Sequence, residues 1–241
     1  MTGGRLLIAI PIICSLLLSA CATDKPVKGS GPRGEEMALD QFAQTDFNRT
    51  VTLEVRDNLA SLHLLLDKLY RRNPREWRKS GAADHDSAVA RVKQAIEKQT
   101  PFSDLAGLRD IQILVVALDP RYQGDRVAAF VFGLADTVIA AHDGKTRIYL
   151  GDVLDGTRIY NAARNVEVAA WLLASRRDSD GQPLLLANEM NASVTNLSFE
   201  REFGIIIGRL DLIANLLDEN ARRIGINYVQ GLLFFNFLPV R

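Results

Sequence analysis

The sequence predicts an all-α protein, a single antiparallel helical bundle of roughly six to eight helices with at most one short strand pair. Along most of the chain, apolar residues recur every three or four positions, as they do on one face of an α-helix. Aspartate, proline and glycine residues separate these stretches. The connections between the stretches are short, which favours antiparallel neighbours within one domain.

The first expected helix has the clearest periodicity. Its apolar stripe consists of Val55, Leu59, Leu62, Leu66 and Leu69. We expect the helix to end near Arg72, because Pro74 disfavours helical geometry at the residue before it. Pro74 in turn suits the first position of a short segment that contains Trp77. Asp84 or Asp86 is suited to cap the next helix, which should extend to Gln99.

Two strongly apolar stretches occupy the middle of the chain. Residues 105–118 fit either a helix or a buried strand, and a helix is predicted because the neighbouring segments are helical. Residues 127–141 are almost wholly apolar, which is typical of a buried helix. His142 and the two residues after it should terminate that helix. Residues 148–150 are the one short strand that we expect.

The last third of the chain should contain three more helices. Asp155 is suited to cap a helix through Arg177, residues 178–183 form a turn, and another helix should begin within 184–197. The final stripe consists of Ile206, Leu210, Ile213 and Leu217. It predicts a helix that ends near Arg223, with Gly225 as its stop. The aromatic and apolar tail, 228–240, either packs into the core or forms an exposed interface.

Composition narrows the class of protein. The chain has 241 residues, of which 47% are hydrophobic and 24% charged, and these are ordinary globular values. Its 29 basic and 29 acidic residues give no net charge. A general nucleic-acid binder carries a strong basic excess, so we expect no nucleic-acid partner.

The N-terminus has the three parts of a secretory signal. Arg5 supplies a positive charge, 6–18 is an apolar run, and Leu18-Ser19-Ala20-Cys21 places small residues before a cysteine. This order resembles the lipobox of bacterial lipoproteins. The resemblance implies that residues 1–20 are a signal peptide cut between Ala20 and Cys21. It also implies a diacylglyceryl group and an N-acyl chain such as palmitate on Cys21.

Two other interpretations of this segment are weaker. An uncleaved transmembrane anchor needs about 20 apolar residues, whereas the run here is shorter and contains Pro11. An ordinary signal peptide would leave Cys21 where it is by chance. The only other cysteine, Cys14, lies within the signal, so the mature chain would have no disulfide bond.

The lipoprotein resemblance sets the expected organisation and location. Residues 21–34 comprise the lipidated cysteine and a flexible Gly- and Pro-rich tether, and 35–241 form the α-helical domain. Ala22 stands where an aspartate resembles an inner-membrane retention signal. We therefore expect a lipid anchor in the cell envelope, in the outer membrane and facing the periplasm.

A cluster of basic residues surrounds Trp77. Its members are Arg71, Arg72, Arg75, Trp77, Arg78 and Lys79. One interpretation is a patch for anionic lipid or an acidic partner. The alternative is that cations are simply favoured at helix C-termini, as Arg176-Arg177 and Arg222-Arg223 also suggest.

Asp136 is the one acid inside the apolar run 127–141, and a buried carboxylate is costly unless it is paired. It is a tuned acid in a cleft, the partner of an arginine on another helix, or a residue on the exposed edge of its own helix. Gly144-Lys145-Thr146 lacks the glycine that a P-loop needs at Ile139. The three histidines fit no metal or catalytic motif. We expect no catalytic residue, no metal and no cofactor beyond the lipid.

The sequence thus predicts a membrane-anchored envelope lipoprotein whose helical domain binds or scaffolds a protein partner, rather than an enzyme. Two alternatives stay open. One is a periplasmic enzyme or small-ligand binder with a site between helices. The other is a lipid-binding module, in which Trp77, its arginines and the aromatic tail share one face.

Overall fold

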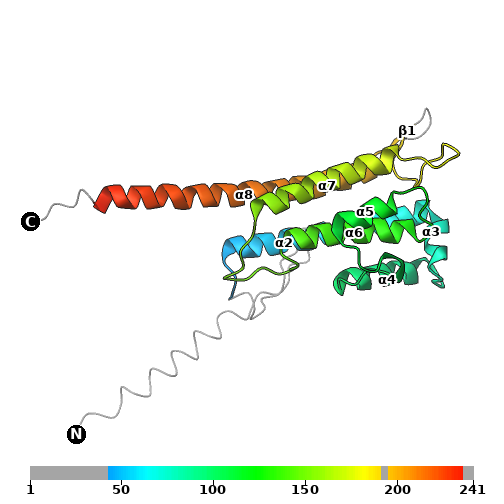
Figure 1. Cartoon of the computed structure of the whole chain (residues 1–241), viewed down its shortest axis with the longest axis horizontal. Coiled ribbons are helices and arrows are strands. Elements are labelled where there is room, and N and C mark those ends of the chain that lie inside the picture. Colours follow the sequence, from blue (N-terminus) through cyan, green and yellow to red (C-terminus); the bar gives the residue numbers. More distant parts are fainter. Residues whose placement is uncertain (1–42, 191–194, 236–241) are drawn as a thin grey trace, which may run out of the picture. The chain divides into compact units, whose positions relative to one another are not determined.

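The computed structural model describes residues 43–190 and 195–235, with the side chains of the last helix described as far as Glu219. This part of the chain contains seven α-helices, one short 3₁₀ turn and one antiparallel strand pair (Figure 1). The all-α bundle predicted from the sequence is therefore confirmed. The helices are α2 (Asp46–Arg72), α3 (Pro74–Lys79), α4 (His85–Glu97), α5 (Asp110–Ala117), α6 (Arg126–Ala141), α7 (Gly156–Ser175) and α8 (Ser198–Phe235).

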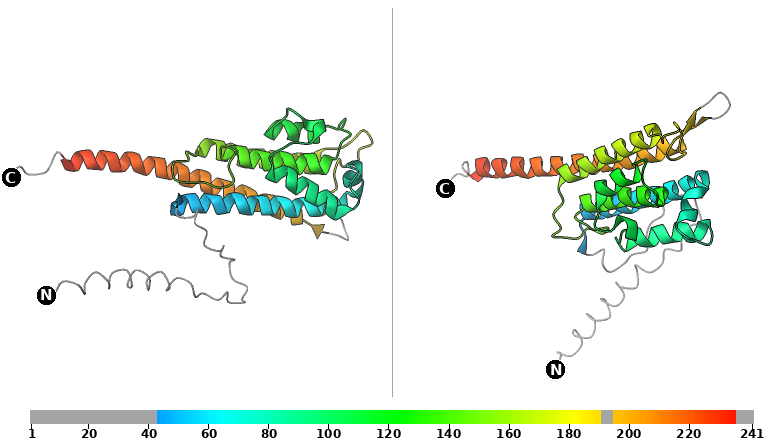
Figure 2. Two further views of the ribbon diagram at one scale, coloured as in Figure 1. Left: turned by 90° about the horizontal axis from the view of Figure 1, so that it is seen from below. Right: turned by 45° about the vertical axis from the view of Figure 1, so that its right-hand side comes forward.

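Four long helices, α2, α6, α7 and α8, form a closed ring in which each contacts the next and neighbours run in opposite directions (Figure 2). Cross-helix contacts fix these directions. The end of α2 meets the start of α6 through Tyr70 and Asp125, and Arg164 of α7 meets Asp211 of α8. Arg209, halfway along the packed part of α8, contacts the Asp57 carbonyl of α2.

Helix α6 lies at the centre of the fold. All of its residues except Ala140 are buried, because α2, α3, α4, α5 and α7 pack around it. This explains its almost wholly apolar sequence, since a helix that is apolar all round has no solvent-facing side. Gly133 allows α5 to lie close, because a Cβ there would be 3.0 Å from Leu114 Cδ2.

Side-chain caps fix where the helices begin. Thr45, Asp84, Asp125 and Asp155 each accept a hydrogen bond from a backbone N–H in the first turn of α2, α4, α6 and α7 respectively. Each such bond satisfies one of the N–H groups that a helix leaves unpaired at its start. The predicted caps at Asp84 and Asp155 are confirmed.

The prediction of one helix over 105–118 is only partly right. A 3₁₀ turn occupies Ser103–Leu105, and α5 begins at Asp110. Gly107 interrupts the segment with a φ of +83°, a conformation that glycine adopts without the steric cost of a Cβ.

The short strand expected at 148–150 is absent from the structure, because its backbone groups have other partners. The Ile148 N–H donates to Thr52 Oγ1 at 3.0 Å, and the Leu150 N–H donates to the Ala43 carbonyl at 2.8 Å. These bonds fasten the loop to the segment that precedes α2 instead of forming a sheet.

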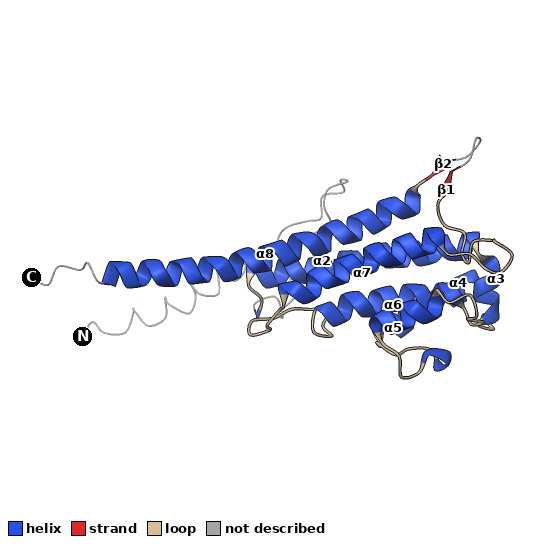
Figure 3. Ribbon diagram, turned by 45° about the horizontal axis from the view of Figure 1, so that its top comes forward, coloured by secondary structure: helices blue, strands red, loops and turns tan. Residues whose placement is uncertain are grey.

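The helix expected within 184–197 is also wrong. This stretch is a loop followed by the hairpin of β1 (Glu189–Met190) and β2 (Thr195–Asn196), which connects α7 to α8 (Figure 3). Asn188 Oδ1 accepts the N–H groups of Phe199 and Glu200, the first turn of α8. An asparagine that caps a helix from outside it competes with helix formation at its own position.

Helix α8 does not end near Arg223 but continues to Phe235, so Gly225 is not its stop. With 38 residues it is far longer than its 20-residue neighbour α7, and it extends beyond the ends of α2 and α7 (Figures 1 and 3). Among the residues of α8 whose side chains the structure describes, Leu217 is the last in contact with the core.

Candidate functional site

The predicted cationic patch lies at the junction of α2 and α3, where most of its charges have partners. Arg71 pairs with Asp67 at 2.8 Å, Arg72 with Glu189 at 2.7 Å, and Lys79 with Glu76 at 2.8 Å. The Arg78 guanidinium lies 5.2 Å from the centre of the Trp77 ring. Arg75 is exposed.

Trp77 is not the centre of an open apolar surface. Its side chain is half-buried and packs against the core. Three of the five cations are neutralised by acids from α2, α3 and β1, and Arg71 and Arg72 close the last turn of α2. This geometry favours the helix-terminus interpretation of the patch over a surface for anionic ligands.

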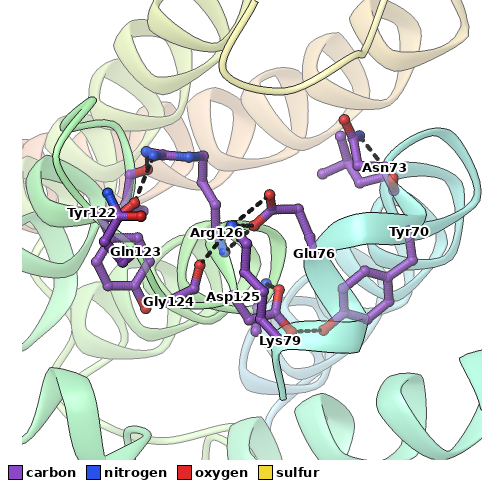
Figure 4. Close-up of polar contacts among 12 residues, drawn as sticks. Tyr70, Asn73, Glu76, Lys79, Tyr122, Gln123, Gly124, Asp125 and Arg126 are labelled. Carbon is purple, nitrogen blue, oxygen red and sulfur yellow. Dashed lines mark hydrogen bonds and ion pairs between the residues drawn. The ribbon is translucent and has the colours of Figure 1, made fainter. Parts of the chain in front are cut away.

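A buried polar network lies beneath this patch, where α2 and α3 meet the start of α6 (Figure 4). The Tyr70 hydroxyl donates to Asp125 Oδ2 at 2.7 Å, and Asp125 Oδ1 accepts the Ala128 N–H at 3.0 Å. Arg91 of α4 approaches Asp125 to 3.5 Å. One carboxylate therefore joins α2 and α4 to the N-terminus of α6.

Burial sets the acidity of this carboxylate. Loss of solvent raises the pKa of Asp125 to about 6, and the Ala128 N–H and the Tyr70 hydroxyl only partly oppose that shift. Burial and the nearby Asp125 charge also raise the pKa of Tyr70. Asp125 thus titrates closer to neutral pH than an ordinary aspartate. It lines none of the three hollows that border α7.

Arg126 is a buried cation with an unusual set of partners. Its guanidinium donates to the carbonyls of Ala117, Asp119 and Tyr122, the end of α5 and the turn after it. Its backbone N–H donates to Glu76 at 2.8 Å, as Figure 4 shows. The side chain therefore fixes the α5–α6 connection rather than facing a ligand.

Asp136 is paired with an arginine, as one of the predicted alternatives requires. Its carboxylate accepts two hydrogen bonds from Arg109, at 2.6 and 2.9 Å, and a third from the Asp110 N–H at 2.7 Å. These bonds hold the start of α5 against the middle of α6. Asp136 lines none of the three hollows that border α7.

A second buried pair joins α2 to the C-terminal end of α6. His142 Nε2 lies 3.1 Å from Glu54 Oε2, and neither atom has another hydrogen-bond partner. His142 Nδ1 donates to the Val138 carbonyl at 2.8 Å, because a carbonyl can only accept. Glu54 Oε1 accepts from Asn58, whose own oxygen faces Arg209 of α8.

The surface at this end of the bundle, where the chain leads into α2, carries exposed apolar side chains beside the acids Asp152, Asp155 and Asp218. Val153 and Leu150 in the loop 149–155 are 87% and 74% exposed, the highest values among the described large hydrophobic residues. Beside them is an open groove of about 640 Å³ between this loop, the start of α7 and the middle of α8. Its walls include Leu154, Tyr160 and Leu217.

The outer face of α7 carries a second group of exposed apolar side chains. Trp171 is 66% exposed and Val168 is 54% exposed, three residues apart on one face. Arg164, one turn earlier, is fixed by Asp211 of α8 at 2.7 Å. A tryptophan this exposed contributes little to the core, so its contact area is available to another molecule.

Several predicted features lie outside the described residues. Ala20 and Cys21, the tether 21–34 and the first residues of the expected domain precede residue 43. Within the described part of the chain, no three His, Cys, Asp or Glu side chains are placed to hold a metal ion. Of the helices that could be searched there, none is long and apolar enough to span a bilayer.

The sequence reasoning missed the buried polar residues of α2 and those at the start of α6, Asp125 and Arg126. Glu54 and Asn58 share the spacing of the apolar stripe, which signals a position on the core face. Asp125 directly precedes an apolar run, which is the ordinary signal of an N-cap. No comparable signal marks Arg126, because its partners are carbonyls that only the tertiary fold brings together.

The fold thus defines a class, the antiparallel α-helical bundle, and the polar clusters are bonds between its helices. Comparison with models of known protein families, with characterised proteins and with solved structures finds no match for this chain.

Proposed function

We propose that this chain is a lipid-anchored envelope lipoprotein whose helical domain binds a protein partner through the outer face of α7. The observation that carries the proposal is the exposure of Trp171 beside Val168 on a helix that is otherwise well packed. Tryptophan is enriched among the residues that dominate the binding energy of protein interfaces. The lipobox resemblance of Leu18-Ser19-Ala20-Cys21 supports the anchor.

Site-directed crosslinking in cells tests the partner. A photoreactive amino acid replaces Trp171 in the full-length chain, and the matched control places it at Lys98, which is also exposed but lies at the end of α4. We expect a discrete adduct at 171 and none at 98. Equal adducts at both positions, or none at 171, would contradict the proposed interface.

The anchor is tested by the mass of the N-terminal peptide of the purified protein. We expect the peptide to begin at Cys21 and to carry a diacylglyceryl group and one amide-linked acyl chain. Cys21→Ser should abolish the modification. A peptide that begins elsewhere, or an unmodified Cys21, would refute the lipoprotein assignment. Mass is the required readout, because membrane fractionation also reports any other contact with lipid.

A further inference from the structure

The segment that leads into α2 is fastened to one end of the bundle. Leu150 donates its N–H to the Ala43 carbonyl, and Gln44 Nε2 donates to the Ile148 carbonyl at 2.6 Å and to Thr52 Oγ1 at 3.0 Å. These bonds join residues 43–44 to the loop 148–150. A membrane anchor before residue 43 would therefore pull on this end of the bundle.

The same end has the most exposed apolar side chains in the described chain. Val153 and Leu150 project from the loop 149–155, and Tyr160 is exposed at the start of α7. On α8, Leu212 and Leu216 are exposed and lie within two residues in sequence of the groove residues Ala214 and Asn215. An apolar surface of this kind on a protein that otherwise has a complete core usually marks contact with another molecule or with lipid.

Helix α8 leaves the bundle at this end as well. It runs antiparallel to α2, with Arg209 beside Asp57. Asp46, the first residue of α2, precedes Asp57 by eleven positions, so eleven residues on from Arg209 bring α8 to the same level, at residue 220. The remaining residues to Phe235 continue past the level of the start of α2 and extend away from the bundle (Figure 1).

The sequence of this extension has basic residues followed by an uncharged apolar stretch, an order expected of a segment at a membrane surface. Arg222 and Arg223 come first, and residues 224–235, IGINYVQGLLFF, carry no charge. At 1.5 Å per residue, these twelve residues span roughly 18 Å. One leaflet of the hydrocarbon core is about 15 Å deep, half of the ~30 Å core. In the sequence, two arginines before an uncharged apolar stretch are typical of segments that meet anionic lipid.

We propose that this end of the bundle is a lipid-binding surface, which seats the domain on a bilayer with anionic headgroups through the loop 149–155 and the extension of α8. The cationic patch takes no part, because it lies at the opposite end of α2. The inference deepens the proposed lipid anchoring: the domain has a second attachment beside Cys21 and does not hang freely from its tether.

Vesicle flotation tests the surface without the acyl chains. The probe is the full mature chain, residues 21–241 with Cys21→Ser, mixed with vesicles of phosphatidylcholine and phosphatidylglycerol in a 3:1 ratio. We expect it to float with these vesicles, and to float less with phosphatidylcholine alone. Arg222→Ala with Arg223→Ala should weaken binding to the anionic vesicles and reduce its dependence on salt.

Two glutamate substitutions locate the contact. Leu150→Glu with Val153→Glu should lower the partition coefficient roughly tenfold, as a loss of about 1.4 kcal/mol implies. The matched control is Val115→Glu on α5, which is 70% exposed but lies away from this end, and it should leave binding unchanged. Both variants should keep the helical circular dichroism and melting temperature of the parent chain.

Three results would overturn the inference. They are failure of the Cys21→Ser chain to float, equal loss of flotation in Val115→Glu, and a dimer that forms without vesicles and is broken by the Leu150 and Val153 substitutions. The last would assign this end to a second copy of the chain. None of these results bears on the adduct at residue 171 or on the mass of Cys21, so the proposed function is decided separately.

Discussion

At the scale of single residues, the buried charged side chains of the described chain lie at contacts between helices or turns. Asp125, Arg126, Asp136 and Glu54 are each buried, and each bonds to a different helix or turn. A buried charge is tolerated when it is paired and hydrogen-bonded, and removal of one partner costs far more than the pair contributes. These residues therefore select how the helices pack, and two of them give sharp predictions.

Asp125 makes stability depend on pH. Its pKa rises from 3.8 in the unfolded chain to about 6 in the folded one, so the folded state binds more protons between these values. Stability should therefore fall as the pH rises from about 4 to about 6, by an amount on the order of 2–3 kcal/mol, and stay level above that. Asp125→Asn keeps the cap and should remove this decline.

Urea unfolding at pH 4, 5, 6 and 7 measures the effect as the difference between the parent chain and Asp125→Asn. That difference isolates Asp125 from the other titrating groups. A difference that does not change with pH would show that the carboxylate is not protonated in the folded protein.

Arg126 should be critical for stability although it touches no ligand. Arg126→Met leaves three carbonyls without their donor, and we expect it to lower the free energy of unfolding by roughly 3–5 kcal/mol. The matched control is Arg121→Met in the same connection, whose side chain is 90% exposed and which should cost less than about 1 kcal/mol. Denaturant titrations followed by circular dichroism should separate the two variants clearly.

At the scale of elements, apolar spacing predicted the long helices and local polar chemistry decided their ends. The stripe of α2 and the apolar run of α6 each predicted the correct helix, because burial of a helix face determines both the apolar spacing in the sequence and the position of the helix. Residues 184–197 did not become a helix, because Asn188 caps α8 from the loop. The end of α8 was also missed, since Gly225 permits a stop but does not impose one.

For the site residues too, the sequence indicates that a partner is needed, but only the tertiary fold decides which one. That Asp136 needs an arginine follows from its apolar surroundings, but which arginine does not. Arg109 is 27 positions away, and only the packing of α5 on α6 brings the two together. The exposure of the apolar residues in the loop 149–155 could not be predicted from the sequence either. An isolated valine or leucine in a loop has the same sequence context whether its side chain is buried or exposed.

The contact between α5 and α6 depends on Gly133, and a pair of valine substitutions tests it. Gly133→Val should destabilise the fold by roughly 1–3 kcal/mol or more, because its Cβ already meets Ile113 and Leu114. Gly208→Val on α8 is the control, since a Cβ there meets nothing within 4 Å, and it should change stability by less than about 0.5 kcal/mol. Thermal unfolding measures both, and equal losses would contradict the close packing of α5 on α6.

At the scale of the whole molecule, four helices close a ring and three shorter ones cover it. Because α6 is buried on all sides, its amides should open only with the whole fold. We expect hydrogen exchange to be slowest in α6 and measurably faster in α4, which has one buried side. Mass-spectrometric exchange on peptic fragments checks this, and faster exchange in α6 than in α4 would contradict the central position of α6.

The length of α2 has an electrostatic consequence. Its 27 residues separate the loop 149–155 from the Arg71–Lys79 cluster by roughly 40 Å. At physiological ionic strength the Debye length is about 8 Å, so a domain seated on lipid by that loop would hold the cluster some five screening lengths above the bilayer. In that orientation the charge of the bilayer would be screened at the cluster, which would interact only with molecules on the side of the domain away from the membrane.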